Sequence, residues 1–151
     1  ELMVLMIQKE VAQRICPPTL KLRRAGAKLS RMNLLAISVQ FYADAKIIGY
    51  VPKEMFWPAP KVDAAIIKIV PKNKRGMTVL QAIANRQSFF KVVKAGFSQP
   101  RKQLIGNLTK KFNIPREKLL EIFKNLNISE RARAENLSLD QWASLAISLH
   151  L

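Results

Sequence analysis

The sequence predicts an α/β segment followed by a small all-α segment, joined by a short basic linker. Three observations indicate this division: apolar runs of strand length within residues 1–71, a polar stretch ending in glycine at 72–76, and apolar residues at three- and four-residue spacing through 77–151. The 151 residues, 49% of them hydrophobic, are sufficient for a buried core. We therefore expect two domains, 1–71 and 77–151.

The first segment is expected to hold strands separated by helices. Leu2–Ile7 is continuously apolar, as in a strand that is covered on both faces of a parallel sheet. Lys9–Ile15 predicts a short helix, which Pro17 and Pro18 bring to an end. The basic stretch Lys21–Arg31 predicts an exposed loop. Apolar patterns predict a further helix and two further strands, at residues 34–39, 40–51 and 64–70 respectively.

The second segment is expected to be helical. Pro115 stands where a first helical turn tolerates proline, and Ser138 with Gln141 resembles a capping box. The helices expected from the apolar spacing are 88–96, 101–112, 116–126 and 139–149.

The chain starts inside an apolar run, with no initiator Met and no leading turn before Leu2. Because a domain seldom starts within its core, we expect further chain upstream of Glu1. Without its sheet neighbours Leu2–Ile7 would be exposed, so we expect residues 1–71 in isolation to aggregate or to be partly disordered.

Positive charge is the strongest compositional signal. There are 26 Lys and Arg against 10 Asp and Glu, giving a net charge of +16, and the excess occurs in both halves of the chain. Such a field attracts polyanions. Nucleic acid is the partner that we favour, and an anionic membrane surface is the alternative. A solubilising surface does not explain this charge, because it would mix both signs and be closer to neutral.

The sequence disfavours disulfide, membrane-spanning and metal-dependent classes. Cys16 is the only cysteine, which fits a reduced compartment, and we expect it to be buried. No apolar run reaches the ~18 residues that span a bilayer, so we expect a cytoplasmic protein without membrane association. His150 has no other metal-ligating residue near it in the sequence. The acidic residues Glu10, Asp44 and Asp63 are too far apart for a metal-binding motif, and we expect each to cap a helix or to pair with a neighbouring Lys or Arg.

The stretch from Val51 to Asp63 is the most informative part of the sequence. Phe56 and Trp57 stand between prolines, which stiffen the backbone and exclude a helix. A rigid loop of this kind can hold a ring outward, where it stacks on an unpaired base. From the residues alone we favour the other interpretation, in which both rings plug the edge of the sheet.

The pattern Val51-Pro52-x-x-x-Phe56-x-Pro58-x-Pro60-Lys61-Val62-Asp63 is similar to the loop motif of the bacterial small-subunit ribosomal RNA adenine dimethyltransferases. Four more blocks resemble the same family in the same order: Gln8-Lys9-Glu10-Val11-Ala12, Gln40-Phe41-Tyr42-Ala43, Phe97-Ser98-Gln99-x-Arg101-Lys102 and Arg133-Ala134-Glu135-Asn136-Leu137-Ser138. The resemblance implies that 1–71 contains the closing strands of a Rossmann-like methyltransferase domain and that 77–151 is a helical RNA-binding domain.

The resemblance also implies a reaction. Members of that family use S-adenosylmethionine to place two methyl groups on the exocyclic nitrogen of each of two adjacent adenines near the 3′ end of small-subunit rRNA, during ribosome biogenesis. Phe56 would stack on the flipped target adenine. The family's glycine-rich loop, cofactor-binding acids and Asn-x-Pro-Tyr motif do not occur in this chain. We therefore expect the chain alone to be inactive. We expect the protein to be a monomer and its partner to be the small ribosomal subunit.

Basic residues are the expected phosphate contacts, although for any single lysine a solvated helix face is the alternative interpretation. The candidates within the loop motif and the second segment are Lys61, Lys91, Lys94, Arg101, Lys102, Lys110 and Lys111. The candidates in the expected exposed loop are Arg23, Arg24, Lys28 and Arg31. The sequence departs from the family pattern at Pro100 and Ile105, where the family has arginines, and at Ala64, where it has serine.

Three rival functions remain. One is the related methyltransferase that modifies large-subunit RNA and confers antibiotic resistance, whose members usually lack the Pro-Lys-Val-Asp and Arg-Ala-Glu-Asn blocks. Another is a non-catalytic RNA-binding or transcription-assisting protein on the same scaffold. Loss of the cofactor motifs upstream of Glu1 would favour this function, and their presence would favour catalysis. The third is a basic membrane-surface module, against which the prolines and the strand pattern argue.

Overall fold

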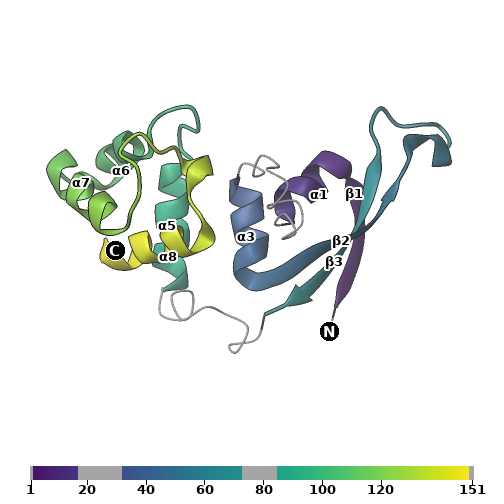
Figure 1. The fold of residues 1–151 in the computed structure, drawn as a ribbon, viewed down its shortest axis with the longest axis horizontal. Coiled ribbons are helices and arrows are strands. Elements are labelled where there is room, and N and C mark those ends of the chain that lie inside the picture. Colours follow the sequence, from purple (N-terminus) through teal and green to yellow (C-terminus); the bar gives the residue numbers. More distant parts are fainter. Residues whose placement is uncertain (1, 17–31, 73–84, 150–151) are drawn as a thin grey trace. The chain divides into compact units, whose positions relative to one another are not determined.

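The computed structural model describes residues 2–16, 32–72 and 85–149 (Figure 1). The chain divides into two compact units, one formed by Glu1–Arg31 with Leu35–Asn73 and the other by Met32–Leu34 with Lys74–Leu151. The expected exposed loop at 21–31 and, apart from Lys72, the expected linker at 72–76 lie outside the described residues.

The first unit contains a sheet built from β1 (Met3–Gln8), β2 (Ala43–Val51) and β3 (Ala64–Pro71). In the described residues the strand order is β1-β3-β2, and both pairs are antiparallel. Among the described strands β1 therefore pairs antiparallel, and not in parallel as predicted for residues 2–7. Leu2 and Met6 are 58% and 53% exposed, as predicted for this run without further sheet neighbours, and within the described residues β1 pairs with β3. A continuous apolar run predicts a strand but not its direction, which the partner strand decides.

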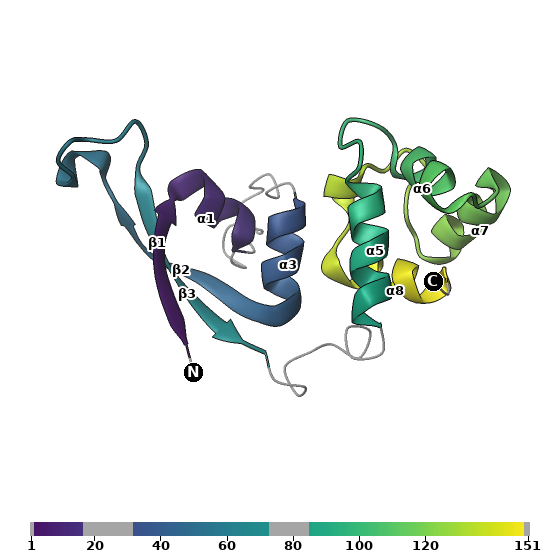
Figure 2. The ribbon, with the colours of Figure 1, turned by 180° about the vertical axis from the view of Figure 1, so that it is seen from behind.

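One face of the sheet is covered by α1 (Lys9–Ile15) and α3 (Leu34–Tyr42), which lie on the same side of it (Figure 2). Since side chains alternate along a strand, Ala65 and Ile67 of β3 point toward this side. They form a core cluster with Ala12 and Ile15 of α1. Cys16 belongs to the same cluster, so its predicted burial is confirmed, and burial raises the pKa of its thiol.

The helix predicted at 9–15 is confirmed, whereas the one predicted at 34–39 continues to Tyr42. The expected second strand consequently starts at Ala43 and not at residue 40. Tertiary contacts hold this last helical turn. The side chain of Gln40 donates a hydrogen bond to the carbonyl of Ile15 at 2.8 Å, and Phe41 is 2% exposed.

The second unit is helical in its described part. Its helices are α5 (Arg86–Gly96), α6 (Leu104–Phe112), α7 (Arg116–Asn125) and α8 (Leu139–Ser148), with a 3-10 turn, η3, at Ala134–Asn136. Each helix predicted for this segment is present. The α6 helix starts at Leu104 and not at residue 101, because residues 99–102 form a turn in which Lys102 N donates to the carbonyl of Gln99. The predicted capping box of Ser138 and Gln141 is confirmed.

The core of the second unit is built around Trp142, which is fully buried. Its ring stacks on Phe97 with 5.8 Å between centroids. Gly96 lies against the same ring, and a side chain at this position would meet both Trp142 and, at 2.8 Å, Leu104 Cδ1. Within the described residues, none of the helices has the length and hydropathy to cross a membrane.

Candidate nucleic-acid interface

The first candidate surface is the loop at residues 52–63, called here the aromatic loop. It joins β2 to β3, and the two strands remain paired up to Val51 and Ala64, so both ends of the loop are held side by side. A 3-10 turn, η1 (Lys53–Met55), follows Pro52, and Met55 N donates to the carbonyl of Pro52 at 3.1 Å. The hairpin projects beyond the paired strands (Figure 1).

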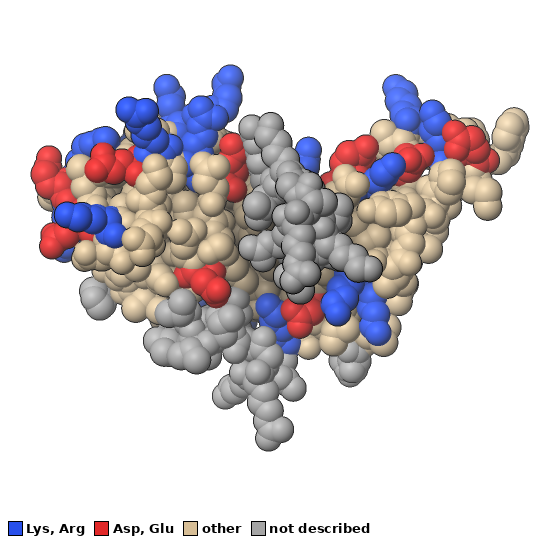
Figure 3. Space-filling model, viewed as in Figure 1, with Lys and Arg blue, Asp and Glu red and all other residues tan. Residues whose placement is uncertain are grey.

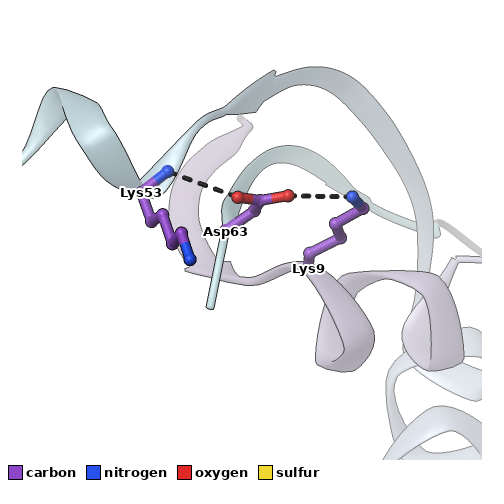
Figure 4. Close-up of polar contacts among 3 residues, drawn as sticks. All are labelled: Lys9, Lys53 and Asp63. Atoms are coloured by element: carbon purple, nitrogen blue, oxygen red, sulfur yellow. Dashed lines mark hydrogen bonds and ion pairs between the residues drawn. The ribbon is translucent and has the colours of Figure 1, made fainter. Parts of the chain in front are cut away.

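Asp63 fastens the end of the aromatic loop to its start and to the neighbouring helix (Figure 4). One carboxylate oxygen accepts a hydrogen bond from Lys9 Nζ at 2.9 Å, and the other accepts one from Lys53 N at 3.3 Å. The backbone carbonyl of Asp63 also accepts from Lys9 N at 3.0 Å. The pairing that the sequence predicted for Asp63 is confirmed, and its partner comes from the first turn of α1.

Charge reinforces this connection. The hydrogen bond from Lys9, followed by that from the Lys53 backbone, lowers the pKa of the Asp63 carboxyl. The same hydrogen bond and the attraction of Asp63 raise the pKa of Lys9. Lys9 Nζ also lies 5.7 Å from the centroid of the Tyr50 ring. The pair is therefore fully charged around neutral pH, although solvent screening at this exposed position limits its contribution to stability.

The two adjacent rings of the aromatic loop differ in exposure. Phe56 is half-buried, whereas Trp57 after it is 98% exposed and Met55 before it is 75% exposed. The favoured interpretation from the residues alone, in which both rings plug the sheet edge, is wrong for Trp57. Lys61 is exposed on the same loop. The loop therefore presents aromatic and apolar surface to solvent with one lysine beside it, and exposed rings are a feature of a surface that binds unpaired bases.

The second candidate surface is formed by the predicted basic residues of the second unit and is called here the basic surface. Its members are all exposed: Lys91, Lys94, Arg101, Lys102, Lys110 and Lys111. Figure 3 shows Lys and Arg side chains gathered along one edge of this unit, over the α5–α6 loop and α6. Positive charge in this density matches a phosphate backbone.

Some members of the basic surface also have a structural role. Lys91 Nζ lies 5.8 Å from the centroid of the Phe112 ring, which connects α5 to the end of α6. Lys110 and Lys111 stand in the last turn of α6, where the helix dipole favours cations. Arg101 and Lys102 lie in the turn between α5 and α6, outside both helices, so the helix dipole does not account for their positive charge.

Asn107 is a positioning residue that the sequence reading missed. It is 6% exposed, and its amide donates to the carbonyls of Gly96 at 2.6 Å and Gln99 at 3.1 Å. These bonds fix the turn that carries Arg101 and Lys102. The available signal was an asparagine within the apolar stripe of α6, because a polar residue on a buried face needs partners.

The remaining sequence predictions have different outcomes. Arg23, Arg24, Lys28 and Arg31 lie outside the described residues. Ile105, where the family pattern has an arginine, is fully buried and belongs to the core. No group of His, Cys, Asp or Glu in the described part of the chain could hold a metal ion.

The junction between β1 and α1 does not fit S-adenosylmethionine. In methyltransferases of the Rossmann type, a glycine-rich turn after a strand lets the backbone approach such a nucleotide-like cofactor. Here β1 passes through Gln8 directly into α1, and the nearby Asp63 carboxylate is already engaged by Lys9. The junction of β1 and α1 therefore offers no glycine-rich cradle for such a cofactor.

Comparisons with known proteins agree on one family. The family model described as "Ribosomal RNA adenine dimethylase" matches residues 1–151. The protein named "Ribosomal RNA small subunit methyltransferase A" from Acaryochloris marina is 39% identical over 99% of this chain and 50% of its own length. The protein of the same name from Crocosphaera subtropica is 38% identical over 97% of this chain and 48% of its own length. The chain spans about half the length of the curated relatives it matches.

Solved structures support the fold. The 23S rRNA methyltransferase ErmE matches with a TM-score of 0.67 at 18% identity, over 100% of this chain and 55% of that one. A dimethyladenosine transferase from Plasmodium falciparum matches with a TM-score of 0.66 at 22% identity, over 99% of this chain and 57% of that one. The α/β fold of this chain is thus similar to that of rRNA methyltransferases.

Proposed function

Because the chain belongs to the ribosomal RNA adenine dimethylase family, we propose that it is part of an enzyme that dimethylates two adjacent adenines near the 3′ end of small-subunit rRNA. The match of the family model to residues 1–151 carries this proposal. The names of the relatives favour the small subunit over the large-subunit alternative. An exposed aromatic loop supports action on a base, because base-modifying enzymes take their target out of the stack.

In this proposal the two candidate surfaces have separate tasks. Phe56, half-buried at the end of η1, stacks on the flipped adenine and forms one wall of its pocket. Lys61 and the basic surface contact phosphates, as do Arg23, Arg24, Lys28 and Arg31. Residues 77–151 serve as the helical RNA-binding domain, and residues 1–71 belong to the catalytic domain.

S-adenosylmethionine is the proposed methyl donor, bound by residues outside this chain. An adenine amino group is a weak nucleophile, since its lone pair is delocalised into the ring, and oriented acceptors are needed before it can attack. The Asn-x-Pro-Tyr motif, to which the family resemblance assigns this task, does not occur in this chain. We therefore assign this chain base exposure and RNA binding, and we expect it to be inactive alone. The complete protein is proposed to act as a monomer on the small ribosomal subunit in the cytoplasm.

The test measures methyl transfer from labelled S-adenosylmethionine to undermethylated small ribosomal subunits by the complete protein. Phe56→Leu keeps an apolar side chain without a ring, and Phe56→Tyr keeps the ring. Loss of stacking costs about 1–3 kcal/mol, so Phe56→Leu should lower transfer by about 5- to 150-fold while Phe56→Tyr retains most of it. RNA binding without any methyl transfer by the wild type would instead favour the non-catalytic scaffold.

A further inference from the structure

Trp57 is the most exposed large apolar side chain of the described residues. The residue is 98% exposed and stands near the middle of the aromatic loop, after the half-buried Phe56 and before the exposed Pro58. A solvated indole contributes nothing to the packing of the unit that carries it. Exposed tryptophans of this kind mark binding surfaces, because the ring offers a large contact area at little cost in conformational entropy.

The backbone separates the two rings. Phe56 has extended dihedral angles, φ −114° and ψ 149°. Consecutive side chains on extended backbone point to opposite sides, so the rings of Phe56 and Trp57 cannot share one face of the same base. If Phe56 holds one base, Trp57 faces another.

The local charge indicates how RNA would be held here. The loop carries Lys53 and Lys61 against Glu54 and Asp63, and the carboxylate of Asp63 is already engaged by Lys9. The loop is thus close to neutral, in contrast to the +16 of the whole chain. Attraction at its tip must come mainly from the ring and not from phosphate neutralisation.

We propose that Trp57 is a second base-stacking residue, which holds an unpaired RNA base beside the base that Phe56 holds. This inference rests on the proposed function and adds a residue that sets the position of the RNA. Its contribution to affinity is insensitive to salt, because stacking releases no counterions.

The experiment uses the two tryptophans of this chain, Trp57 and the fully buried Trp142. Single-stranded oligoadenylate RNA is titrated into the protein while tryptophan emission and the anisotropy of labelled RNA are followed at several salt concentrations. The variants are Trp57→Ala and Trp57→Phe, with Met55→Ala as the matched control, because Met55 is an exposed apolar residue of the same loop. Thermal melts verify that the variants remain folded.

We expect RNA to quench the wild-type emission and to leave that of Trp57→Phe unchanged. Trp57→Ala should weaken binding by about 5- to 150-fold, and the factor should be the same at every salt concentration. Trp57→Phe should weaken it less, and Met55→Ala should have little effect. Unchanged affinity in Trp57→Ala, with RNA still bound, would overturn the inference and leave the proposed function standing. Failure of the wild-type protein to bind RNA would overturn both.

Discussion

Lys9 and Asp63 contact each other twice, through their backbones at 3.0 Å and through their side chains at 2.9 Å. The double contact joins the start of α1 to the last residue of the aromatic loop, and Asp63 also accepts a hydrogen bond from Lys53 N. A single carboxylate thus fixes both ends of the loop that presents Phe56 and Trp57. Two of the five family blocks, the one that starts at Gln8-Lys9 and the one that ends at Lys61-Val62-Asp63, contribute residues to this contact.

Asp63→Asn should loosen the aromatic loop without unfolding the unit. The amide keeps one acceptor but loses the charge that Lys9 requires. Misplacement of Phe56 should lower methyl transfer by the complete protein by up to about 100-fold. Asp44→Asn is the matched control, since Asp44 is exposed and lies 3.6 Å from Lys72, away from the loop. Equal losses in both variants would show that the Asp63 contact does not position the loop.

The same contact predicts a dependence on pH. The pKa of Asp63 is lowered in the folded protein, so its contribution to stability is present above the ordinary carboxyl value of about 3.9 and is lost as the pH falls through the lower folded value. The pKa of Lys9 is raised, so its contribution is present below about 10.4 and is lost as the pH rises through the higher folded value.

The chemical shift of the Lys53 amide proton reports the acid step by NMR. We expect its midpoint below about 3.9 in the wild type, and no such step in Asp63→Asn. A midpoint at or above the ordinary value would contradict the hydrogen bonds described for Asp63.

Gly96→Ala should destabilise the second unit. The new methyl group would collide with the ring of Trp142 and approach Leu104 Cδ1 to 2.8 Å, and overpacking of this kind costs about 1–3 kcal/mol. Gly106→Ala is the control, because a side chain there meets nothing within 4 Å. Gly106 is the third residue of α6, and alanine there should stabilise by up to about 0.5–1 kcal/mol. Urea unfolding measures both, and two changes of the same sign would disprove the predicted contrast.

Asn107→Leu should cost stability and RNA affinity together. The substitution removes the donor for the carbonyls of Gly96 and Gln99 and leaves that of the buried Gly96 without a partner, at a cost of about 1–3 kcal/mol. The turn that carries Arg101 and Lys102 would then no longer be fixed. Asn125→Leu, on the exposed end of α7, should change stability by less than about 0.5 kcal/mol. Unfolding curves and RNA titrations on both variants test this; unaltered RNA binding by Asn107→Leu would remove its positioning role.

Arg101→Gln and Lys102→Gln should each weaken RNA binding in a salt-dependent manner. Each lost phosphate contact reduces the slope of log affinity against log salt by about 0.7 on single strands. Lys118→Gln, exposed on α7, serves as the charge-matched control and should leave the slope unchanged. Equal slopes for all three variants would place the phosphate contacts elsewhere.

Local signals in the sequence predicted most of the secondary structure. The helix at 9–15, the helices of the second unit and the capping box of Ser138 with Gln141 depend on neighbouring residues, through apolar spacing, prolines and capping side chains. The family resemblance likewise depends on short motifs, and the comparisons confirm it. The roles assigned to Phe56 and to the basic residues remain predictions.

The tertiary structure decided what depends on partners distant in the sequence. The antiparallel direction of β1 comes from its pairing with β3, and the last turn of α3 is held by the contact of Gln40 with Ile15. The exposure of Trp57 next to a half-buried Phe56 depends on where the loop leaves the sheet. A linear pattern records which side chains are apolar, but burial and strand pairing are set by contacts across the fold. The sequence therefore determined the elements and the family, and the structure determined which ring and carboxylate form the aromatic loop and which turn carries part of the basic surface.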